Sequence, residues 1–259
     1  MDYTTVTEIP GDKVTLDQLK RMYTRYFFAS KLCEGKDVLE IACGAGQGLG
    51  LLAKSARRVV GGDYTENLLR IAQKHYQGRI PLLRLDAHRL PFKESSFDVV
   101  ILYEAIYYLK EPEEFIKECV RILKESGMLL ICTANKDWAG FNPSPFSVRY
   151  FSAPELYHLL KKHNFDVQLF GDSPVNSNSF KEKIIILLRR MAVAMHLIPK
   201  TMKGKEKLKR LFYGRLLELG GEIKEGTMDY QAPIPIDATS PNRDYKVLFA
   251  VGRISKVEA

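Results

Sequence analysis

Short apolar runs alternate with amphipathic segments along most of the chain. Apolar residues at helical spacing predict a helix over 15–33, and the mostly apolar run 36–42 predicts a strand. Continuous apolar strands are typical of parallel sheets whose two faces are covered by helices. We expect further strands at 57–64, 80–90, 97–105, 128–135, 166–171 and 244–254, and helices at 48–56, 65–77, 111–127 and 152–165.

This alternation predicts an α/β fold built on an open, doubly wound, mostly parallel sheet of seven strands. Ligands bind to such sheets beyond the carboxyl ends of the strands, where the strand order reverses. Polar side chains occupy the predicted strand ends, so we expect them to meet in one crevice. They are Glu40, Asp63, Asp86, Tyr103 with Glu104, and Asn135.

One region interrupts the pattern before the last strand. We predict one domain formed by residues 1–170 plus 244–259, with a basic, partly helical insertion at 171–243. Residues 181–224 hold twelve Lys/Arg and four Asp/Glu, whereas the rest of the chain holds 27 of each. The insertion has three interpretations: a cap over a bound substrate, a contact with an anionic ligand or membrane surface, or a dimer contact. We favour the cap. The rest of the chain has no net charge, which argues against specific nucleic-acid binding.

The cysteine pattern predicts a cytoplasmic protein, and we expect a monomer or homodimer. The N-terminal twenty residues are polar, and no run reaches the roughly eighteen apolar residues that a membrane span requires. The four cysteines are scattered and have no histidine at metal-ligand spacing, which predicts reduced thiols and no metal site.

The stretch VLEIACGAGQGLG at 38–50 joins the first predicted strand of the sheet to the next helix. Glycines there permit either a tight turn or the close approach of a ligand, and we favour ligand binding. The dinucleotide pattern Gly-x-Gly-x-x-Gly is broken by Leu49, and no Gly-Lys-Ser/Thr follows. Glu40 would repel a phosphate but would suit a cation, which disfavours a nicotinamide-dependent oxidoreductase.

The segment Glu40-Ile-Ala-Cys-Gly44-Ala-Gly46 resembles the first motif of class I S-adenosylmethionine-dependent methyltransferases. VVGGDYTENLLRIA, LLRLDAHRLPF and SFDVVILYEAIYYL resemble the later motifs, so the likeness covers roughly residues 22–170 plus the last strand. It implies a Rossmann-like fold and S-adenosyl-L-methionine as the cofactor. Asp63 would then hold the ribose hydroxyls, and Asp86 with the Ala87 N–H would hold the adenine.

The resemblance also implies the rest of the cofactor site. Arg25 and Tyr26 would reach the cofactor carboxylate, and Tyr64 would lie against the adenine. Ala42 stands where many members of the family have glycine. The remaining residues of the expected site are Glu40, Ala42, Gly44, Gly46, His88 and Tyr103.

Structural alternatives exist for the three acidic residues. Asp63 precedes Thr65 and would serve as a helix cap, and Asp86 would serve as a turn residue. Glu40 would form a salt bridge to Arg25. We favour ligand binding for Asp63 and Asp86 because both follow predicted strands at the expected binding edge.

Methyl transfer from a sulfonium requires mainly alignment and exclusion of water, and an oxygen acceptor usually also needs a base. The expected acceptor is a small molecule, and our best hypothesis is a hydroxyl of a sugar or sugar-containing metabolite. The alternatives are an RNA or protein methyltransferase and a non-catalytic regulatory protein that binds the cofactor. The candidate catalytic residues are Glu104, Tyr107, His88 and Asp137, with Tyr108 beside them.

Overall fold

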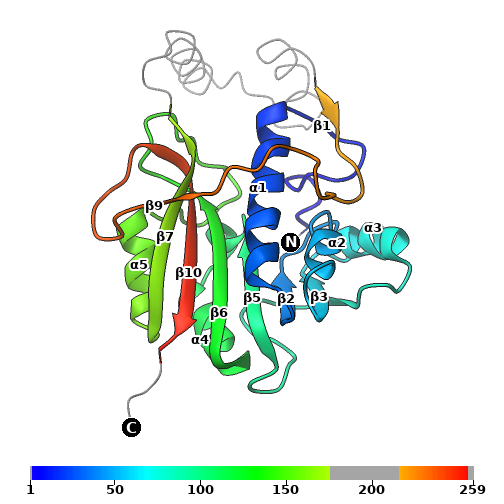
Figure 1. Ribbon diagram of the computed structural model, residues 1–259, viewed down its shortest axis with the longest axis horizontal. Coiled ribbons are helices and arrows are strands. Elements are labelled where there is room, and N and C mark those ends of the chain that lie inside the picture. The colour runs from blue at the N-terminus through cyan, green and yellow to red at the C-terminus, as the bar shows by residue number, and fades with distance from the viewer. Residues whose placement is uncertain (1, 176–215, 256–259) are drawn as a thin grey trace.

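The computed structural model describes residues 2–175 and 216–255. Its centre is an eight-stranded sheet in the order β4-β3-β2-β5-β6-β10-β7-β9 (Figure 1). The strands β4, β3, β2, β5 and β6 run parallel to one another, whereas β10 is antiparallel to both β6 and β7. The bounds are β2 Asp37–Ile41, β3 Arg58–Asp63, β4 Leu82–Arg84, β5 Phe97–Tyr103, β6 Leu123–Ala134, β7 Phe165–Pro174, β9 Ile234–Pro235 and β10 Tyr245–Ile254.

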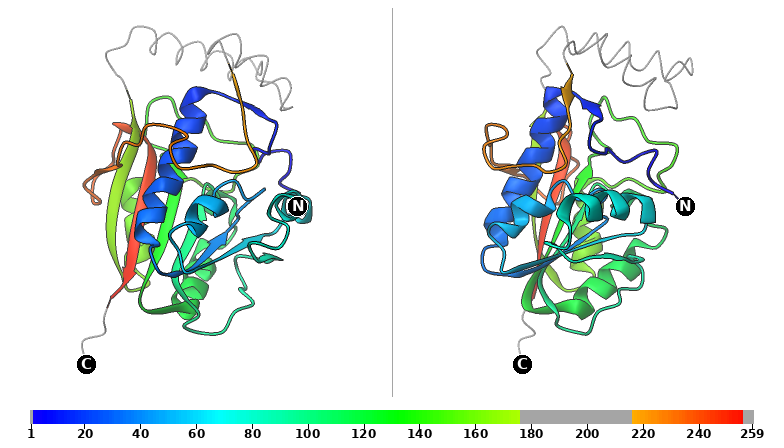
Figure 2. Two further views of the ribbon diagram at one scale, coloured as in Figure 1. Left: turned by 45° about the vertical axis from the view of Figure 1, so that its right-hand side comes forward. Right: turned by 90° about the vertical axis from the view of Figure 1, so that its right-hand side faces the viewer.

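Helices cover both faces of the sheet (Figures 1 and 2). Alternate residues of β5 point to opposite faces, so Val99 and Ile101 join one apolar core while Val100 and Leu102 join the other. The first core is shared with α1, α2 and α3, and the second with α4 and α5. The bounds are α1 Leu16–Leu32, α2 Leu49–Ala53, α3 Glu66–Tyr76, the 3₁₀ turn η1 Ile106–Tyr108, α4 Pro112–Ile122 and α5 Ala153–Lys161.

Local signals fix where two of the helices begin. The Thr15 hydroxyl accepts a hydrogen bond from the Gln18 N–H, and the Gln18 side chain accepts one from the Thr15 N–H. Ser152 and Glu155 form the same reciprocal pair at the start of α5. Because each pair satisfies N–H groups that the first helical turn leaves free, the starts agree closely with those predicted.

The predicted boundary between α4 and β6 is wrong. The helix ends at Ile122 rather than near 127, and β6 begins at Leu123, which pairs with Phe97 of β5. The strand predicted at 80–90 is also too long, because β4 pairs with β3 only over Leu82–Arg84. Pairing with a neighbouring strand, which periodicity does not reveal, set both ends.

The sheet has eight strands rather than the predicted seven. The additional strand is β9, two residues long, which pairs with Phe170 and Gly171 of β7 at the edge of the sheet. A separate ribbon joins β1 (Lys13–Val14) to β8 (Leu217–Glu218). Both β8 and β9 come from the predicted insertion, where no apolar periodicity marks a strand.

Part of the predicted insertion packs on the main domain. Leu219 and Ile223 are buried in the core that contains α1 and α2. A Cβ on Gly50 of α2 would lie 2.2 Å from the Glu222 carboxyl group, so a larger residue there would displace the end of the Glu222 side chain. Residues 176–215, which hold eleven Lys/Arg and two Asp/Glu, lie outside the described residues, so the division at 171–243 stays a prediction. Within the described part of the chain, no helix has the length and apolar character to cross a membrane.

Strand order reverses between β2 and β5. From β2 the chain proceeds to β3 and β4 on one side, and it then returns to place β5 on the other side. The connections leaving β2 and β5 therefore diverge at the carboxyl edge of the sheet, which opens a crevice there.

Candidate active site

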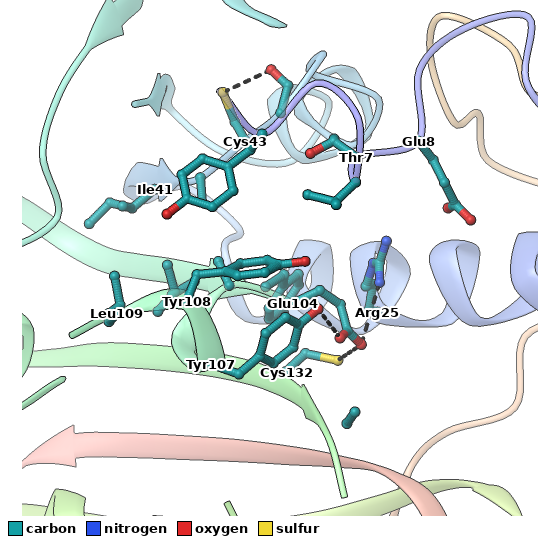
Figure 3. Close-up of a pocket in the computed structure, with 18 of the residues that line it drawn as sticks. Thr7, Glu8, Arg25, Ile41, Cys43, Glu104, Tyr107, Tyr108, Leu109 and Cys132 are labelled. Atoms are coloured by element: carbon teal, nitrogen blue, oxygen red, sulfur yellow. Dashed lines mark hydrogen bonds and ion pairs between the residues drawn. The ribbon is translucent and has the colours of Figure 1, made fainter. Parts of the chain in front are cut away.

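A pocket of about 890 Å³ lies at the carboxyl ends of β2, β3 and β5 (Figure 3). Its remaining walls come from α1, from η1, from the loop after β6 and from the N-terminal residues 3–8. Ligand pockets usually measure roughly 300–1,000 Å³, so this one has the volume for a large ligand or for two smaller molecules together.

Gly44 is the glycine of the loop that lines this pocket. Its φ of +58° lies in the left-handed region, and a Cβ there would come within 3.1 Å of the Thr7 methyl group. Ala42 has the same left-handed backbone conformation, with φ +58°. This conformation favours glycine, which explains why a small residue suits the position. The loop therefore presents its backbone to the pocket at Gly44.

The next glycines of the loop serve packing instead. A Cβ on Gly46 would lie 2.9 Å from the Tyr76 ring, and a Cβ on Gly48 would lie 1.9 Å from the Tyr26 ring. Gly46 lies outside the pocket lining, although it was predicted to bind the cofactor. The alternate glycines thus let α1 and α3 approach the loop.

Asp63 ends β3 and is buried with its carboxylate at the pocket. Its two oxygens accept hydrogen bonds from the Gly44 N–H at 2.9 Å and the Thr65 N–H at 2.7 Å. Burial raises its pKa, and the backbone hydrogen bonds act against that rise. Each carboxylate oxygen has a further acceptor position, so Asp63 can also accept from two hydroxyl groups of a ligand.

Asp86 lies just beyond β4 and, unlike Asp63, is half exposed. Its carboxylate binds the His88 N–H at 2.9 Å and the His88 ring Nδ1 at 2.7 Å. Ala87 and Tyr64 line the same end of the pocket. The structure therefore places His88 among the expected adenine contacts.

Glu104 follows β5 and lies between Arg25 and Tyr107 (Figure 3). Its Oε1 lies 3.7 Å from an Arg25 guanidinium nitrogen, and its Oε2 accepts a hydrogen bond from the Tyr107 hydroxyl at 3.1 Å. Its φ of +52° is a left-handed conformation that costs energy for a residue other than glycine. The predicted alternative in which Arg25 pairs with Glu40 is wrong, because the ion pair forms with Glu104.

Glu40 is buried behind the glycine loop and does not line the pocket. One carboxylate oxygen accepts a hydrogen bond from the Tyr26 hydroxyl at 2.6 Å, and the other has no partner among the described residues. Burial raises the pKa of Glu40 to about 7, although Tyr26 and Arg25 lower it. Glu40 thus places a buried titratable group beneath the glycine loop.

Glu40→Gln is expected to flatten the dependence of folding stability on pH. The pKa of Glu40 is about 7 in the folded protein against a usual value of 4.5. A raised pKa gives stability that is complete below the unfolded value and is lost as the pH rises through the folded value. Between pH 4 and pH 8 the wild type should therefore lose up to about 3 kcal/mol relative to the variant.

Urea unfolding of both proteins at pH 5 and pH 8, followed by circular dichroism, measures this difference. Glutamine still accepts the Tyr26 hydrogen bond, so the comparison isolates the charge. An equal change with pH in the two proteins would contradict the assignment.

Aromatic rings form a continuous wall of the pocket that runs from the N-terminal segment to the loop after β6. Tyr3 lies 5.1 Å from Tyr108, and Tyr108 lies 4.6 Å from Tyr107 between ring centroids. Tyr107 stacks on Tyr150 at 4.7 Å, and Tyr150 meets Phe141 at 4.7 Å. All five residues line the pocket. The wall offers a broad apolar surface to a ring-shaped molecule.

The structure separates the four predicted catalytic residues. Glu104 and Tyr107 are hydrogen bonded to each other, whereas His88 belongs to the Asp86 end and Asp137 lies outside the pocket lining. No role was predicted for residues 3–8 or for Phe141 and Tyr150, which belong to the aromatic wall. The cluster of aromatic residues in the Pro- and Ser-containing segment 138–150 was the available signal for that loop.

The chemistry of the pocket fits S-adenosylmethionine. Asp63 and Asp86 suit its hydroxyl and amino donors, Arg25 suits its carboxylate, and Gly44 allows close approach. Two residues of the pocket lining also carry buried polar atoms without a partner among the described residues, the Arg25 Nε and the Tyr103 hydroxyl. Buried polar groups nearly always have a hydrogen-bond partner, so these two atoms are available to a ligand or a water molecule in the pocket.

Comparisons with known proteins agree with this site. Residues 39–131 match the family model described as "Methyltransferase domain". A probable S-adenosylmethionine-dependent methyltransferase of Mycolicibacterium smegmatis is 36% identical over 142 residues, which are 52% of this chain and 54% of that protein. A ubiquinone biosynthesis O-methyltransferase of Coxiella burnetii is 29% identical over 62% of this chain and 68% of that protein.

The fold is shared with solved structures. A S-adenosylmethionine-dependent methyltransferase from Thermotoga maritima, titled a possible histamine N-methyltransferase, superposes with a TM-score of 0.60 at 17% identity and covers 92% of each chain. The fold is thus that of a Rossmann-like methyltransferase. The chain carries a class I S-adenosylmethionine-dependent methyltransferase domain, whose cofactor is S-adenosyl-L-methionine. It spans about half the length of the first of these curated relatives.

Proposed function

We propose that the protein transfers a methyl group to a hydroxyl of a small, ring-shaped acceptor. The observation that carries this proposal is the position of Glu104 between Arg25 and the aromatic wall. Bound S-adenosylmethionine would supply an activated methyl group. Asp63 and Asp86 would hold its nucleoside end, which leaves the wall side of the pocket for the acceptor.

Glu104 is the proposed base. Its carboxylate is held from two sides, by Arg25 at 3.7 Å and by the Tyr107 hydroxyl at 3.1 Å. A carboxylate fixed in this way would accept the proton of an acceptor hydroxyl that lies on the aromatic wall. Tyr107 would position Glu104 rather than exchange the proton, because burial and the nearby Glu104 raise its pKa well above the usual value.

Two acceptor classes fit the wall. A sugar hydroxyl is the acceptor expected from the sequence, and the apolar face of a sugar ring would pack on Tyr107 and Tyr108. A hydroxylated quinone-like ring is the second candidate, supported by the resemblance to the ubiquinone O-methyltransferase and by the stacked pair Tyr107–Tyr150. Both place a ring against the same surface.

An acceptor panel tests the proposal. The protein is incubated with S-adenosylmethionine labelled in the methyl group and with either sugars and sugar nucleotides or reduced, hydroxylated quinones. Mass spectrometry then identifies any product that has gained one methyl group. We expect turnover within one of the two classes, on oxygen. Methylation only of amines, RNA or protein, or cofactor binding without turnover on any acceptor, would contradict the proposal.

A further inference from the structure

The N-terminal residues 2–8 cross the pocket and are tied to both of its sides. At one end, the Tyr3 N–H donates to the Thr65 hydroxyl at 3.3 Å, and the Asn67 amide donates to Asp2 at 3.0 Å. At the other end, the Gln47 amide of the glycine loop donates to the Glu8 carbonyl at 2.7 Å. The segment is therefore a fixed part of the pocket wall.

The Glu8 side chain is held at the pocket beside Arg25 (Figure 3). Its Oε1 accepts a hydrogen bond from the Gln18 amide at 2.6 Å, and the capping box of α1 fixes Gln18 in turn. Its Oε2 makes no hydrogen bond with any described residue, which leaves it available to a donor in the pocket. A carboxylate oriented by a fixed amide is well suited to bind a cation.

The charges around Arg25 indicate what that cation is. Burial lowers the pKa of Arg25, but Tyr26, Glu104 and Glu8 act in the opposite direction and the net result is a raised pKa. Two carboxylates thus face one guanidinium at the end of the pocket beyond Gly44. A ligand group that carries both an ammonium and a carboxylate matches this arrangement, because Arg25 takes the anion and one acid remains for the cation.

We propose that Glu8 binds the α-ammonium group of the cofactor's amino-acid end. This inference rests on the proposed function, in which S-adenosylmethionine occupies the pocket. It assigns a binding role to the N-terminal segment: Thr7 covers Gly44 while Glu8 neutralises the charge beside it. The remaining acid, Glu104, is then free to act toward the acceptor.

Calorimetric binding of two ligands to Glu8→Gln tests the assignment. S-adenosylhomocysteine contains the amino-acid end, whereas 5′-methylthioadenosine keeps the adenine, ribose and thioether but lacks that end. Loss of a charge-assisted hydrogen bond should weaken S-adenosylhomocysteine about 10- to 100-fold. Binding of methylthioadenosine should stay within about twofold, which also reports that the variant is folded.

Glu34→Gln is the matched control, because Glu34 is an exposed acid directly after α1 that does not line the pocket. It should change neither affinity. Equal weakening of both ligands by Glu8→Gln would show a structural role for Glu8, and unchanged affinities would show that it does not contact the ammonium; either result overturns the inference. If the wild type bound neither ligand, the proposed function itself would fail.

Discussion

Glu104→Gln is expected to lower kcat for methyl transfer to a hydroxyl acceptor by about 10²- to 10⁴-fold. The amide keeps nearly the same shape, and its oxygen still accepts the hydrogen bond that Tyr107 donates at 3.1 Å. It has no capacity to take up the acceptor proton. Steady-state rates with the acceptor found in the panel measure the loss, and S-adenosylhomocysteine affinity should change less than about tenfold.

Tyr107→Phe is the matched control for this variant. It keeps the ring that stacks on Tyr150 at 4.7 Å but removes the hydroxyl that holds Glu104. Because the carboxylate remains, we expect a decrease in kcat of no more than about tenfold. A Glu104→Gln protein with wild-type turnover would show that no base acts at this position, as alignment of the reactants alone would then suffice.

Asp63→Ala is expected to weaken S-adenosylhomocysteine binding by roughly 10²- to 10³-fold. The substitution removes the acceptor that we propose for the ribose hydroxyls. It also removes the hydrogen bonds that the carboxylate accepts from Gly44 at 2.9 Å and Thr65 at 2.7 Å, so the glycine loop loses its anchor. Isothermal calorimetry measures the affinity, and thermal unfolding checks that the variant folds.

Asp86→Ala separates this effect from a general loss of negative charge. Asp86 is half exposed, and among the described residues its carboxylate binds His88 alone, so solvent screens it and we expect less than a tenfold loss. Comparable losses for the two variants would contradict the different roles assigned to them. An Asp63→Ala protein that kept wild-type affinity would remove the main support for the ribose site.

Local features of the sequence determined most of the core fold. Continuous apolar strands alternating with amphipathic helices define a sheet covered on both faces, and the capping pairs at Thr15 and Ser152 locate two helix starts. Acids directly after strands marked the binding edge, so Asp63, Asp86 and Glu104 all line one pocket. These signals succeed because the carboxyl ends of parallel strands meet on one side of the sheet.

The tertiary structure alone decided which side chains line the pocket. Glu40 and Gly46 belong to the predicted motif, yet one is buried on Tyr26 and the other packs on Tyr76. Glu8 lies far from any recognisable motif, and its position depends on Gln18 and Gln47. Contacts between segments distant in the chain leave no periodic trace, so only the folded arrangement reveals them. The sequence by itself determined most of the sheet, the cofactor and the acids at the carboxyl edge of the sheet, while long-range packing decided the walls of the pocket and the partners of each charged group.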